Sequence, residues 1–358
     1  MKATLGRASS ALLTAFLVWS LVATVSAERD PVGLFPIVEN NKWGYIDGTG
    51  KVVIPPRFDL ADYFYEGRAL VLTGKQTIRH PDSEHEIVVG KWGYIDTYGN
   101  FVIPPKFDNA DSFSEGLAGV SVDGIWGFID RAGEFVIEPQ YYSTQPFSEG
   151  LAIVRKEMGE PFLVVDKTGK VLYEVPYSWI GPFSDGLAVF SSNDNSKKFG
   201  YIDRSGNQVT PAVYGSSHRF SDGLAAVRLD GKMGYIDKEG RTAIAFKFEL
   251  AGDFSEGLAP ACLEKGCGFV DKNGRFVIDP RVFDSEPFKN GYARVYDENG
   301  KVGFIDRSGR VVIEPQFEEA ENFIDGLAEI RLGDPVSYLL GYIDTRGQFV
   351  WKREKPLK

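Results

Sequence analysis

The chain repeats one short motif nine times. The motif is Trp-Gly-aromatic-Ile-Asp, and it is complete at Trp43–Asp47, Trp92–Asp96 and Trp126–Asp130. Weaker copies place their aspartate at positions 166, 203, 237, 271, 306 and 344, so successive aspartates lie 34 to 49 residues apart. A period in this range is typical of stacked supersecondary units, each of which buries its apolar face against its neighbours. The sequence therefore predicts one continuous repeat array over residues 28–358.

Each unit has the pattern of three short antiparallel strands. The first begins at a pair such as Leu224-Ala225, and an Asp-Gly hairpin turn follows it in some units. The motif itself is the second strand, and an Asp-x-x-Gly turn leads to a third strand such as Val53-Ile54, which proline ends. We expect an all-β fold of about nine three-stranded meanders. The units start near residues 33, 67, 116, 150, 186, 223, 257, 291 and 326.

The two ends of the array bear on its shape. The first unit holds all three strands between Leu34 and Ile54, and the last holds them between Leu327 and Val350. A ring closed by one strand shared between the ends would leave partial units there. We therefore expect an open, curved solenoid, with a closed propeller-like ring as the alternative.

Three recurring segments carry a resemblance to a known family. They are Lys-Trp-Gly-Tyr-Ile-Asp at 42–47 and 91–96, Ile-Pro-Pro-x-Phe at 54–58 and 103–107, and Phe-Ser-Glu-Gly-Leu-Ala at 113–118. Together they resemble the WG-repeat family of bacterial proteins over about residues 33–351. The resemblance implies a tandem β-repeat array, often exported, and no general enzymatic activity. The chain departs from the family where later units fill the Trp position with Phe, Met, Cys, Val or Leu, which indicates core packing.

Residues 1–27 have the pattern of a secretory signal peptide. Lys2 and Arg7 form a basic start, residues 11–25 are an apolar run, and Val25-Ser26-Ala27 offers a cleavage site. A retained transmembrane anchor is the alternative, although the apolar run is short for a bilayer span. We expect an exported protein, periplasmic or extracellular, that is not inserted in the membrane after cleavage.

The charge balance restricts the class of partner. Loss of the two basic residues of the signal peptide would change the net charge from −10 to about −12. Such a surface repels phosphate backbones and anionic lipid, so we expect no nucleic-acid partner. The sequence also indicates no cofactor.

Two sets of acidic residues recur with the repeat. One aspartate begins each Asp-x-x-Gly turn, where its carboxylate can accept hydrogen bonds from the backbone of the turn. Calcium would need several oxygen ligands from one loop, which one aspartate per turn does not supply. The second set precedes Gly-Leu-Ala, and turn chemistry explains it as well, with an acidic ladder for a cationic partner as the alternative. Its members are Glu66, Glu115, Glu149, Asp185, Asp222, Glu256 and Asp325.

Histidines offer little support for catalysis or metal binding. The chain has three, His80, His85 and His218, and none lies in a nucleophile motif. The first two are the best candidates for metal ligands, but the His80–His85 spacing matches no zinc motif, and a solvated loop is the favoured interpretation. We therefore expect no metal site and no catalytic residues.

The two cysteines predict a structural disulfide. Alignment of the repeats places Cys262 opposite Cys267 across a two-residue turn, where cross-strand Cβ atoms come close. An exported protein with a single cysteine pair favours a bond between them. A redox-active pair is the alternative, although the spacing is not Cys-x-x-Cys.

Three insertions lengthen the same hairpin in different units. They lie at residues 73–90, 193–198 and 333–338, which would place them on one rim of the array. Insertions on a single face often mark the binding face of a repeat protein, while drift at a permissive turn is the alternative. The first insertion is the expected binding loop. Its charged residues and histidines, the candidates for binding, are Lys75, Arg79, His80, Asp82, Glu84, His85 and Glu86.

The sequence thus favours an exported, non-enzymatic scaffold that binds another protein. A glycan or cell-wall binding module is the first alternative, and it requires a row of exposed rings. A hydrolytic enzyme is the second, since carboxylates of different units could meet in space. The rings for the first alternative are Tyr63, Tyr65, Tyr142, Trp179 and Trp351.

Overall fold

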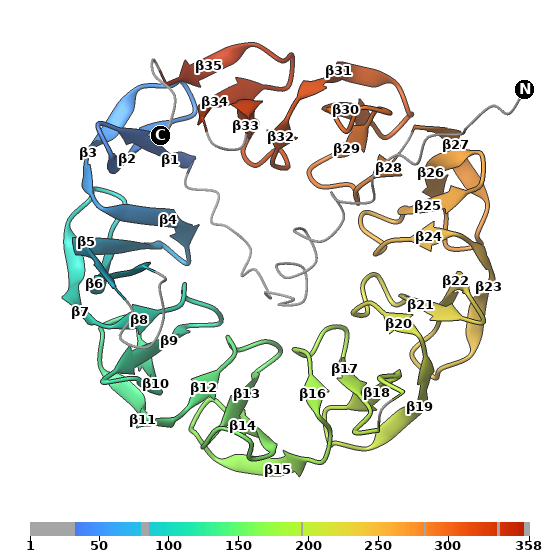
Figure 1. The fold of residues 1–358 in the computed structure, drawn as a ribbon, viewed down its shortest axis with the longest axis horizontal. Helices are drawn as coiled ribbons and strands as arrows, with labels where there is room; N and C mark the ends of the chain where they lie inside the picture. Colours follow the sequence, from blue (N-terminus) through green and yellow to red (C-terminus); the bar gives the residue numbers. More distant parts are fainter. Residues whose placement is uncertain (1–32, 80–85, 195, 283, 335–336, 354–358) are drawn as a thin grey trace, which may run out of the picture.

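The structure is a computed structural model that describes residues 33–79, 86–194, 196–282, 284–334 and 337–353. These residues form nine antiparallel sheets, eight with four strands and the first with three. The strands of every sheet follow one another in chain order, so each sheet is a meander. Figure 1 shows the sheets arranged as the blades of a ring, with the first blade beside the ninth. The all-β prediction is confirmed.

Four strand positions recur from blade to blade. The first strand is short, and none of the described residues forms a counterpart in blade 1: β4 (Leu60–Tyr65), β8 (Asn109–Ala110), β12 (Ser143–Thr144), β16 (Trp179–Ile180), β20 (Ser216–Ser217), β24 (Leu250–Ala251), β28 (Asp284–Ser285) and β32 (Glu319–Ala320). The second strands are β1 (Leu34–Glu39), β5 (Arg68–Arg79), β9 (Leu117–Val122), β13 (Leu151–Arg155), β17 (Leu187–Ser191), β21 (Ala225–Leu229), β25 (Ala259–Leu263), β29 (Tyr292–Tyr296) and β33 (Leu327–Asp334).

The third strands carry the recurring motif, and the fourth strands lie at the outer rim of the ring (Figure 1). The third strands are β2 (Lys42–Asp47), β6 (Glu86–Ile95), β10 (Ile125–Asp130), β14 (Phe162–Asp166), β18 (Phe199–Asp203), β22 (Lys232–Ile236), β26 (Gly266–Val270), β30 (Val302–Asp306) and β34 (Ser337–Asp344). The fourth strands are β3 (Val52–Phe58), β7 (Phe101–Phe107), β11 (Phe135–Tyr141), β15 (Val171–Val175), β19 (Gln208–Tyr214), β23 (Thr242–Phe248), β27 (Phe276–Val282), β31 (Val311–Phe317) and β35 (Phe349–Lys352).

Eight of the nine blades contain one strand more than the three-stranded units predicted from sequence. The extra strand comes from the linker between units, as in β8, where Asn109 pairs with Ser121 and Ala110 with Val120. In most blades this strand has only two residues, which is too short for an alternating pattern to indicate a strand.

Proline does not end the outer strand, contrary to the sequence-based expectation. Strand β3 runs through Pro55 and Pro56 to Phe58, which pairs with Trp43. Two features permit this. The outer strand is the edge of its sheet, where a missing N–H donor removes no ladder bond, and the pairing shifts register between Trp43 and Tyr45 as in a β-bulge.

The glycine of the motif permits that bulge. A Cβ atom on Gly93 would lie 2.7 Å from the Ile103 carbonyl oxygen and 2.7 Å from the Pro105 nitrogen. Both are backbone atoms of the bulged outer strand, so they cannot move aside as the end of a flexible side chain can. The outer strand therefore packs directly on the Cα atom of this glycine.

The array is a closed ring, so the preferred prediction of an open solenoid is wrong and its alternative is correct. The turn glycine of each blade packs against the outer strand of the blade before it: Gly133 lies on Ile103, and Gly50 of blade 1 lies on Val350 of blade 9. Ring closure needs no shared strand, because the turn glycine of blade 1 packs on the outer strand of blade 9 in the same way as between other neighbours. Complete terminal units were therefore no argument against a ring.

The hydrophobic core lies between adjacent blades. Tyr94 of blade 2 is buried together with Phe107, Phe113 and Val120, which belong to its own outer strand and to blade 3. The interface between blades 9 and 1 has the same character, with Phe35 and Tyr342 buried in one cluster. The Trp position contributes to these cores, and Met233 and Cys267, which replace Trp there, are buried. The prediction of a packing role for this position is confirmed.

The two ends of the strands define two faces of the ring. The hairpins between second and third strands project from one face, which we call the hairpin face. The Asp-x-x-Gly turns lie on the other, which we call the turn face, because Asp130 pairs with Leu117 at the start of the second strand. The loops that precede Leu117 and its counterparts therefore also belong to the turn face.

Candidate functional site

The three long loops all project from the hairpin face. They join β5 to β6, β17 to β18 and β33 to β34, the same pair of strand positions in blades 2, 5 and 9. The prediction that they share one rim is confirmed by this topology. The blade 2 hairpin is the longest, with backbone pairing from Gln76↔Val89 to Arg79↔Glu86. The adjacent strand β4 pairs with β5 only as far as Leu72, and β7 pairs with β6 only from Trp92 onward. The two-stranded ribbon therefore extends beyond the rest of the sheet.

The described part of the predicted binding loop is limited. The Lys75 side chain is exposed, and its backbone N–H donates to Asp59 Oδ2 at 3.0 Å. Arg79 and Glu86 are paired through their backbones. The other four predicted residues of this loop, His80, Asp82, Glu84 and His85, lie outside the described residues.

The turn aspartates cap their own turns, as predicted. Asp47 Oδ1 accepts hydrogen bonds from the backbone N–H groups of Thr49 at 2.9 Å and Lys51 at 3.1 Å. The same bonds recur in the other blades, for instance at Asp306. Bonds from the Thr49 side chain and backbone lower the pKa of Asp47. These carboxylates are therefore engaged in local structure.

The second acidic set has the predicted turn role and an additional role between blades. Glu115 has a φ of 53°, in the left-handed region, and its Oε2 accepts from the Gly150 N–H of the next blade at 2.8 Å. Lys167 Nζ of that blade lies 3.1 Å from the same carboxylate. The set thus holds neighbouring blades together. The carboxylates that accept a hydrogen bond from a glycine N–H of the next blade are those of Glu66, Glu115, Glu149, Asp185, Asp222, Glu256 and Asp325.

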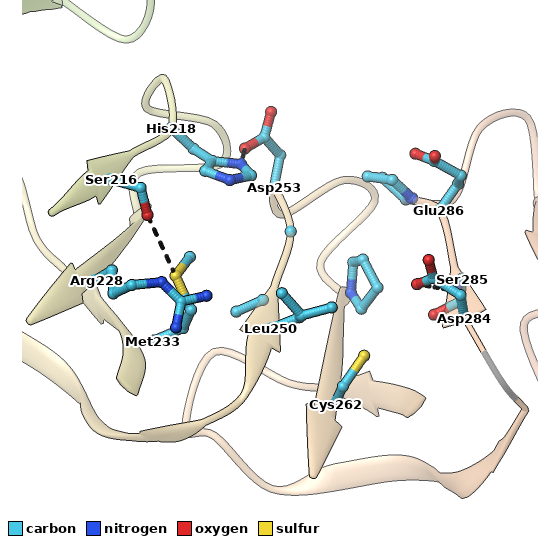
Figure 2. Close-up of a pocket in the computed structure, with 14 residues that line it drawn as sticks. Ser216, His218, Arg228, Met233, Leu250, Asp253, Cys262, Asp284, Ser285 and Glu286 are labelled. Atoms are coloured by element: carbon cyan, nitrogen blue, oxygen red, sulfur yellow. Dashed lines mark hydrogen bonds and ion pairs between the residues drawn. The ribbon is translucent and has the colours of Figure 1, made fainter. Parts of the chain in front are cut away.

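A cavity of about 400 Å³ opens where blades 6, 7 and 8 meet. Figure 2 shows its lining, with Ser216, His218, Arg228 and Met233 from blade 6 and the remaining labelled residues from blades 7 and 8. Its central polar contact joins His218 Nδ1 to Asp253 Oδ1 at 2.8 Å. Arg219 Nε lies 3.4 Å from the other oxygen of Asp253, so this carboxylate is shared by two partners.

Glu286 and Asp284 add acidic groups to the blade 8 side of the cavity. Burial raises the pKa of Glu286, and nearby Asp284 and Asp253 raise that pKa further, while Arg294 lowers it. Arg228, on the opposite wall, donates to the Gly231 and Glu249 carbonyl oxygens. The cavity therefore combines fixed polar pairs with a carboxyl group that holds its proton more tightly than usual.

Sulfur atoms lie in and beside the same cavity. The structure joins Cys262 to Cys267, as predicted, and Cys262 lines the cavity. Ser216 Oγ lies 3.7 Å from Met233 Sδ on the blade 6 wall. Among the described residues, one group of three or more potential metal ligands is close together, and it consists of the two cysteines and Asp284.

A larger cavity of about 720 Å³ lies between blades 8 and 9. Gly333 and Tyr338 of the blade 9 hairpin line it, so it reaches the hairpin face. Arg331 extends along its wall, with its guanidinium carbon 5.0 Å from the centre of the Tyr338 ring. Arg331 also pairs with Glu319 at 2.6 Å.

The rings named for glycan binding do not form an exposed row. Tyr65 is only 8% exposed, whereas Tyr142 is 42% exposed. Trp179 and Trp351 pack against core clusters, and the Tyr63 hydroxyl donates to Glu329 at 2.8 Å. This set of rings therefore does not provide the stacking surface that the alternative requires.

Sequence reasoning missed the cavity residues because they come from different blades. His218 was known only as an isolated histidine, and Asp253 and Glu286 were not singled out. Position 253 follows 218 by one repeat length, and 286 follows 253 by nearly the same distance. With ring geometry assumed, this spacing could have indicated that the three side chains come from neighbouring blades.

Nine meander sheets around a closed ring define a nine-bladed β-propeller. A crystal structure of the eukaryotic initiation factor has a similar fold, with 10% identity, a TM-score of 0.58, and coverage of 91% of this chain and 96% of that chain. The chain belongs to the family described as WG containing repeat. The family model matches residues 43–75, 92–124, 126–157, 164–195, 199–232, 233–267, 268–301 and 303–334.

Other solved structures are less similar to this chain. BamB from Moraxella catarrhalis is 15% identical, with a TM-score of 0.40 and coverage of 73% of this chain and 97% of that chain. Hsv2 from Kluyvelomyces marxianus is 9% identical, with a TM-score of 0.38 and coverage of 65% and 90%. No curated protein matches the chain. Within the described residues, no helix has the length and apolar character to cross a membrane.

Proposed function

We propose that this propeller is an exported scaffold that binds another protein through its hairpin face and catalyses no reaction of its own. The observation that carries the proposal is the shared direction of the three long hairpins. They project from one face, and the hairpin of blade 9 lines the larger cavity. A ring scaffold that presents loops on one face is a common arrangement for recognition.

The charge of the chain supports a basic partner. The net charge is −10, and Glu318, Glu319 and Glu321 line the larger cavity. Opposite charge would accelerate association with such a partner. Export rests on the signal-peptide pattern of residues 1–27. Mass measurement of the protein recovered outside the cytoplasm tests this, because cleavage after Ala27 would leave Glu28 as its first residue.

The scaffold proposal is tested by capture with crosslinking from the cell envelope. The mature chain is compared with a variant in which a two-residue Asp-Gly turn replaces residues 74–90. A control carries Glu239→Ala and Arg241→Ala, two exposed substitutions on the turn face. We expect one protein to be captured by the mature chain and the control but not by the shortened variant.

The opposite outcome is equally clear. If the three proteins capture the same material, the blade 2 hairpin is not the contact. If cell-wall fragments raise the melting temperature and no protein is captured, the glycan alternative replaces the scaffold. Turnover of those fragments by the purified chain would contradict the non-enzymatic part of the proposal.

A further inference from the structure

The junction of blades 7 and 8 brings two sulfur atoms and a carboxylate together. Cys262 and Cys267 are cross-strand partners in β25 and β26, and Asp284 begins the first strand of the next blade. Their ligand atoms all lie within 4.8 Å of one another. The cysteines are 7% and 4% exposed, while Asp284 is exposed and lines the cavity together with Cys262.

We propose that reduction of the Cys262–Cys267 disulfide creates a Zn²⁺ site formed by the two thiolates and the Asp284 carboxylate. The reductant is a dithiol. It transfers two electrons and two protons to the disulfide, the Sγ–Sγ bond breaks, and the dithiol becomes a disulfide in turn. Zn²⁺ then displaces one proton from each cysteine thiol.

The distances are compatible with zinc after small movements of the side chains. Zn–S bonds of about 2.3 Å and Zn–O bonds of about 2.1 Å place tetrahedral ligand atoms roughly 3.6–3.8 Å apart. The ligand atoms now lie within 4.8 Å of one another, so each would have to move by about 1 Å to reach this geometry. Breaking the S–S bond frees both sulfur atoms to separate. Directly opposite backbone positions keep them on the same side of the hairpin.

The ligand set favours zinc over other metals. Thiolates exclude the hard cations calcium and magnesium, and a carboxylate oxygen is a better ligand for Zn²⁺ than for Cu⁺. Three protein ligands leave a fourth tetrahedral position open. Cys262 and Asp284 line the cavity, so water from the cavity could occupy that position.

No other blade of this chain offers the same three groups. The two positions that Cys262 and Cys267 occupy in blade 7 hold Arg228 and Met233 in blade 6. The following first strand has Leu250 where blade 8 has Asp284. The site is therefore a local departure from the repeat and is not needed to build a blade.

Cobalt titration tests the proposal on the mature full-length chain, reduced with a phosphine that is then removed under anaerobic conditions. We expect the reduced chain to bind one Co²⁺ with a thiolate-to-cobalt charge-transfer band, which Zn²⁺ abolishes. The oxidised chain should show no such band. Asp284→Asn should weaken Co²⁺ binding by at least about 10- to 100-fold. That is the usual effect of removing a group that only hydrogen-bonds to a metal ligand, and Asp284 is proposed as a ligand itself. Glu286→Gln, on the same cavity wall, is the matched control.

A second measurement separates metal binding from folding. Zn²⁺ should raise the melting temperature of the reduced chain and leave that of the oxidised chain unchanged. Cys262→Ser and Cys267→Ser variants should lose the shift. The proposal is overturned if the reduced chain gives no charge-transfer band, if Asp284→Asn binds Co²⁺ as tightly as the native sequence, or if reduction unfolds the chain and Zn²⁺ does not restore it.

Discussion

The Tyr342 hydroxyl of blade 9 donates a hydrogen bond to the Pro36 carbonyl oxygen of blade 1 at 2.8 Å. Inside the ring, equivalent tyrosines also donate to a backbone carbonyl of the next blade: Tyr45 to the Asp62 carbonyl at 2.6 Å and Tyr94 to the Asp111 carbonyl at 2.7 Å. Those acceptors lie in or just after the first strand of the next blade, whereas Pro36 lies in β1, which is a second strand. The closing interface therefore keeps a bond from tyrosine to a carbonyl of the next blade but places its acceptor one strand further on. The Tyr342 hydroxyl is also 3.1 Å from Glu329 Oε2.

Tyr342→Phe should destabilise the ring more than the same change at an internal blade. It leaves the buried Pro36 carbonyl without this donor and removes the hydroxyl that lies 3.1 Å from Glu329, a carboxyl group whose pKa is raised by burial. We expect a loss of about 1–3 kcal/mol in the free energy of unfolding, measured by urea denaturation. Tyr201→Phe, which removes a bond to the His218 carbonyl, is the control. Equal losses in both variants would show that Glu329 adds nothing to the closing interface.

Asp111→Asn should change how stability depends on pH. Burial raises the pKa of Asp111 to about 7, so the folded chain binds this proton more tightly than the unfolded chain, whose carboxyl has a pKa of about 3.9. The contribution of the protonated Asp111 carboxyl to the free energy of unfolding is therefore fully present below about pH 4 and is lost as pH rises to 7. Removing the titration should recover up to about 4 kcal/mol at neutral pH.

Urea midpoints between pH 4 and 8 measure this effect. Asp111→Asn should give a flatter profile than the native chain, with the two curves closest at pH 4. Asp123→Asn, in an exposed hairpin turn, makes the same change of charge and serves as the control. Parallel profiles for the native chain and Asp111→Asn would contradict the prediction.

Local features of the fold could be predicted from sequence because each has a short-range cause. The Asp-x-x-Gly turns follow from a carboxylate that bonds the backbone two and four residues on, as at Asp47. The Cys262–Cys267 bond follows from hairpin register. Ring closure has no such signature, because the Tyr342 bond ends on a backbone carbonyl, which any residue at position 36 would provide.

The candidate site was less predictable for a related reason. His218, Asp253 and Glu286 belong to three blades, and their meeting depends on the angle between successive sheets, which the repeat period does not encode. The long blade 2 hairpin was visible as an insertion, but the cavities were not. They arise where short first strands such as Asp284–Ser285 and Glu319–Ala320 face the preceding blade.

Substitutions at Asp222 should separate backbone geometry from the bond between blades. Asp222 has a φ of 54°, and its Oδ2 accepts from the Gly257 N–H at 2.9 Å. Asparagine tolerates this conformation and keeps an acceptor oxygen, and Asn290 occupies the equivalent position in blade 8 at a φ of 52°. Asp222→Asn should therefore cost less than about 1 kcal/mol.

Asp222→Ala should cost more, about 2–3 kcal/mol, because it loses the acceptor and places a Cβ-bearing residue without a polar side chain at positive φ. Thermal denaturation of the two variants beside the native chain measures the difference. Similar losses for asparagine and alanine would mean that the charge of Asp222 is the important property. In that case the negative charge of Asp222 would stabilise the contact with blade 7 by attracting a nearby cation. Lys272 of blade 7, which donates to the Asp222 carbonyl, is such a cation.

Gly93→Ala should test whether the bulge in the outer strand explains the glycine of the motif. The new Cβ would lie 2.7 Å from the backbone atoms of Ile103 and Pro105, so the outer strand must move away from the blade. We expect a loss of about 3 kcal/mol, at the upper end for overpacking, because backbone cannot yield as a side chain can. Gly48→Ala is the matched control, since a Cβ there meets no atom within 4 Å. Urea denaturation should leave Gly48→Ala close to the native chain, and a similar result for Gly93→Ala would mean that the outer strand adapts and that this glycine is not required by the close approach.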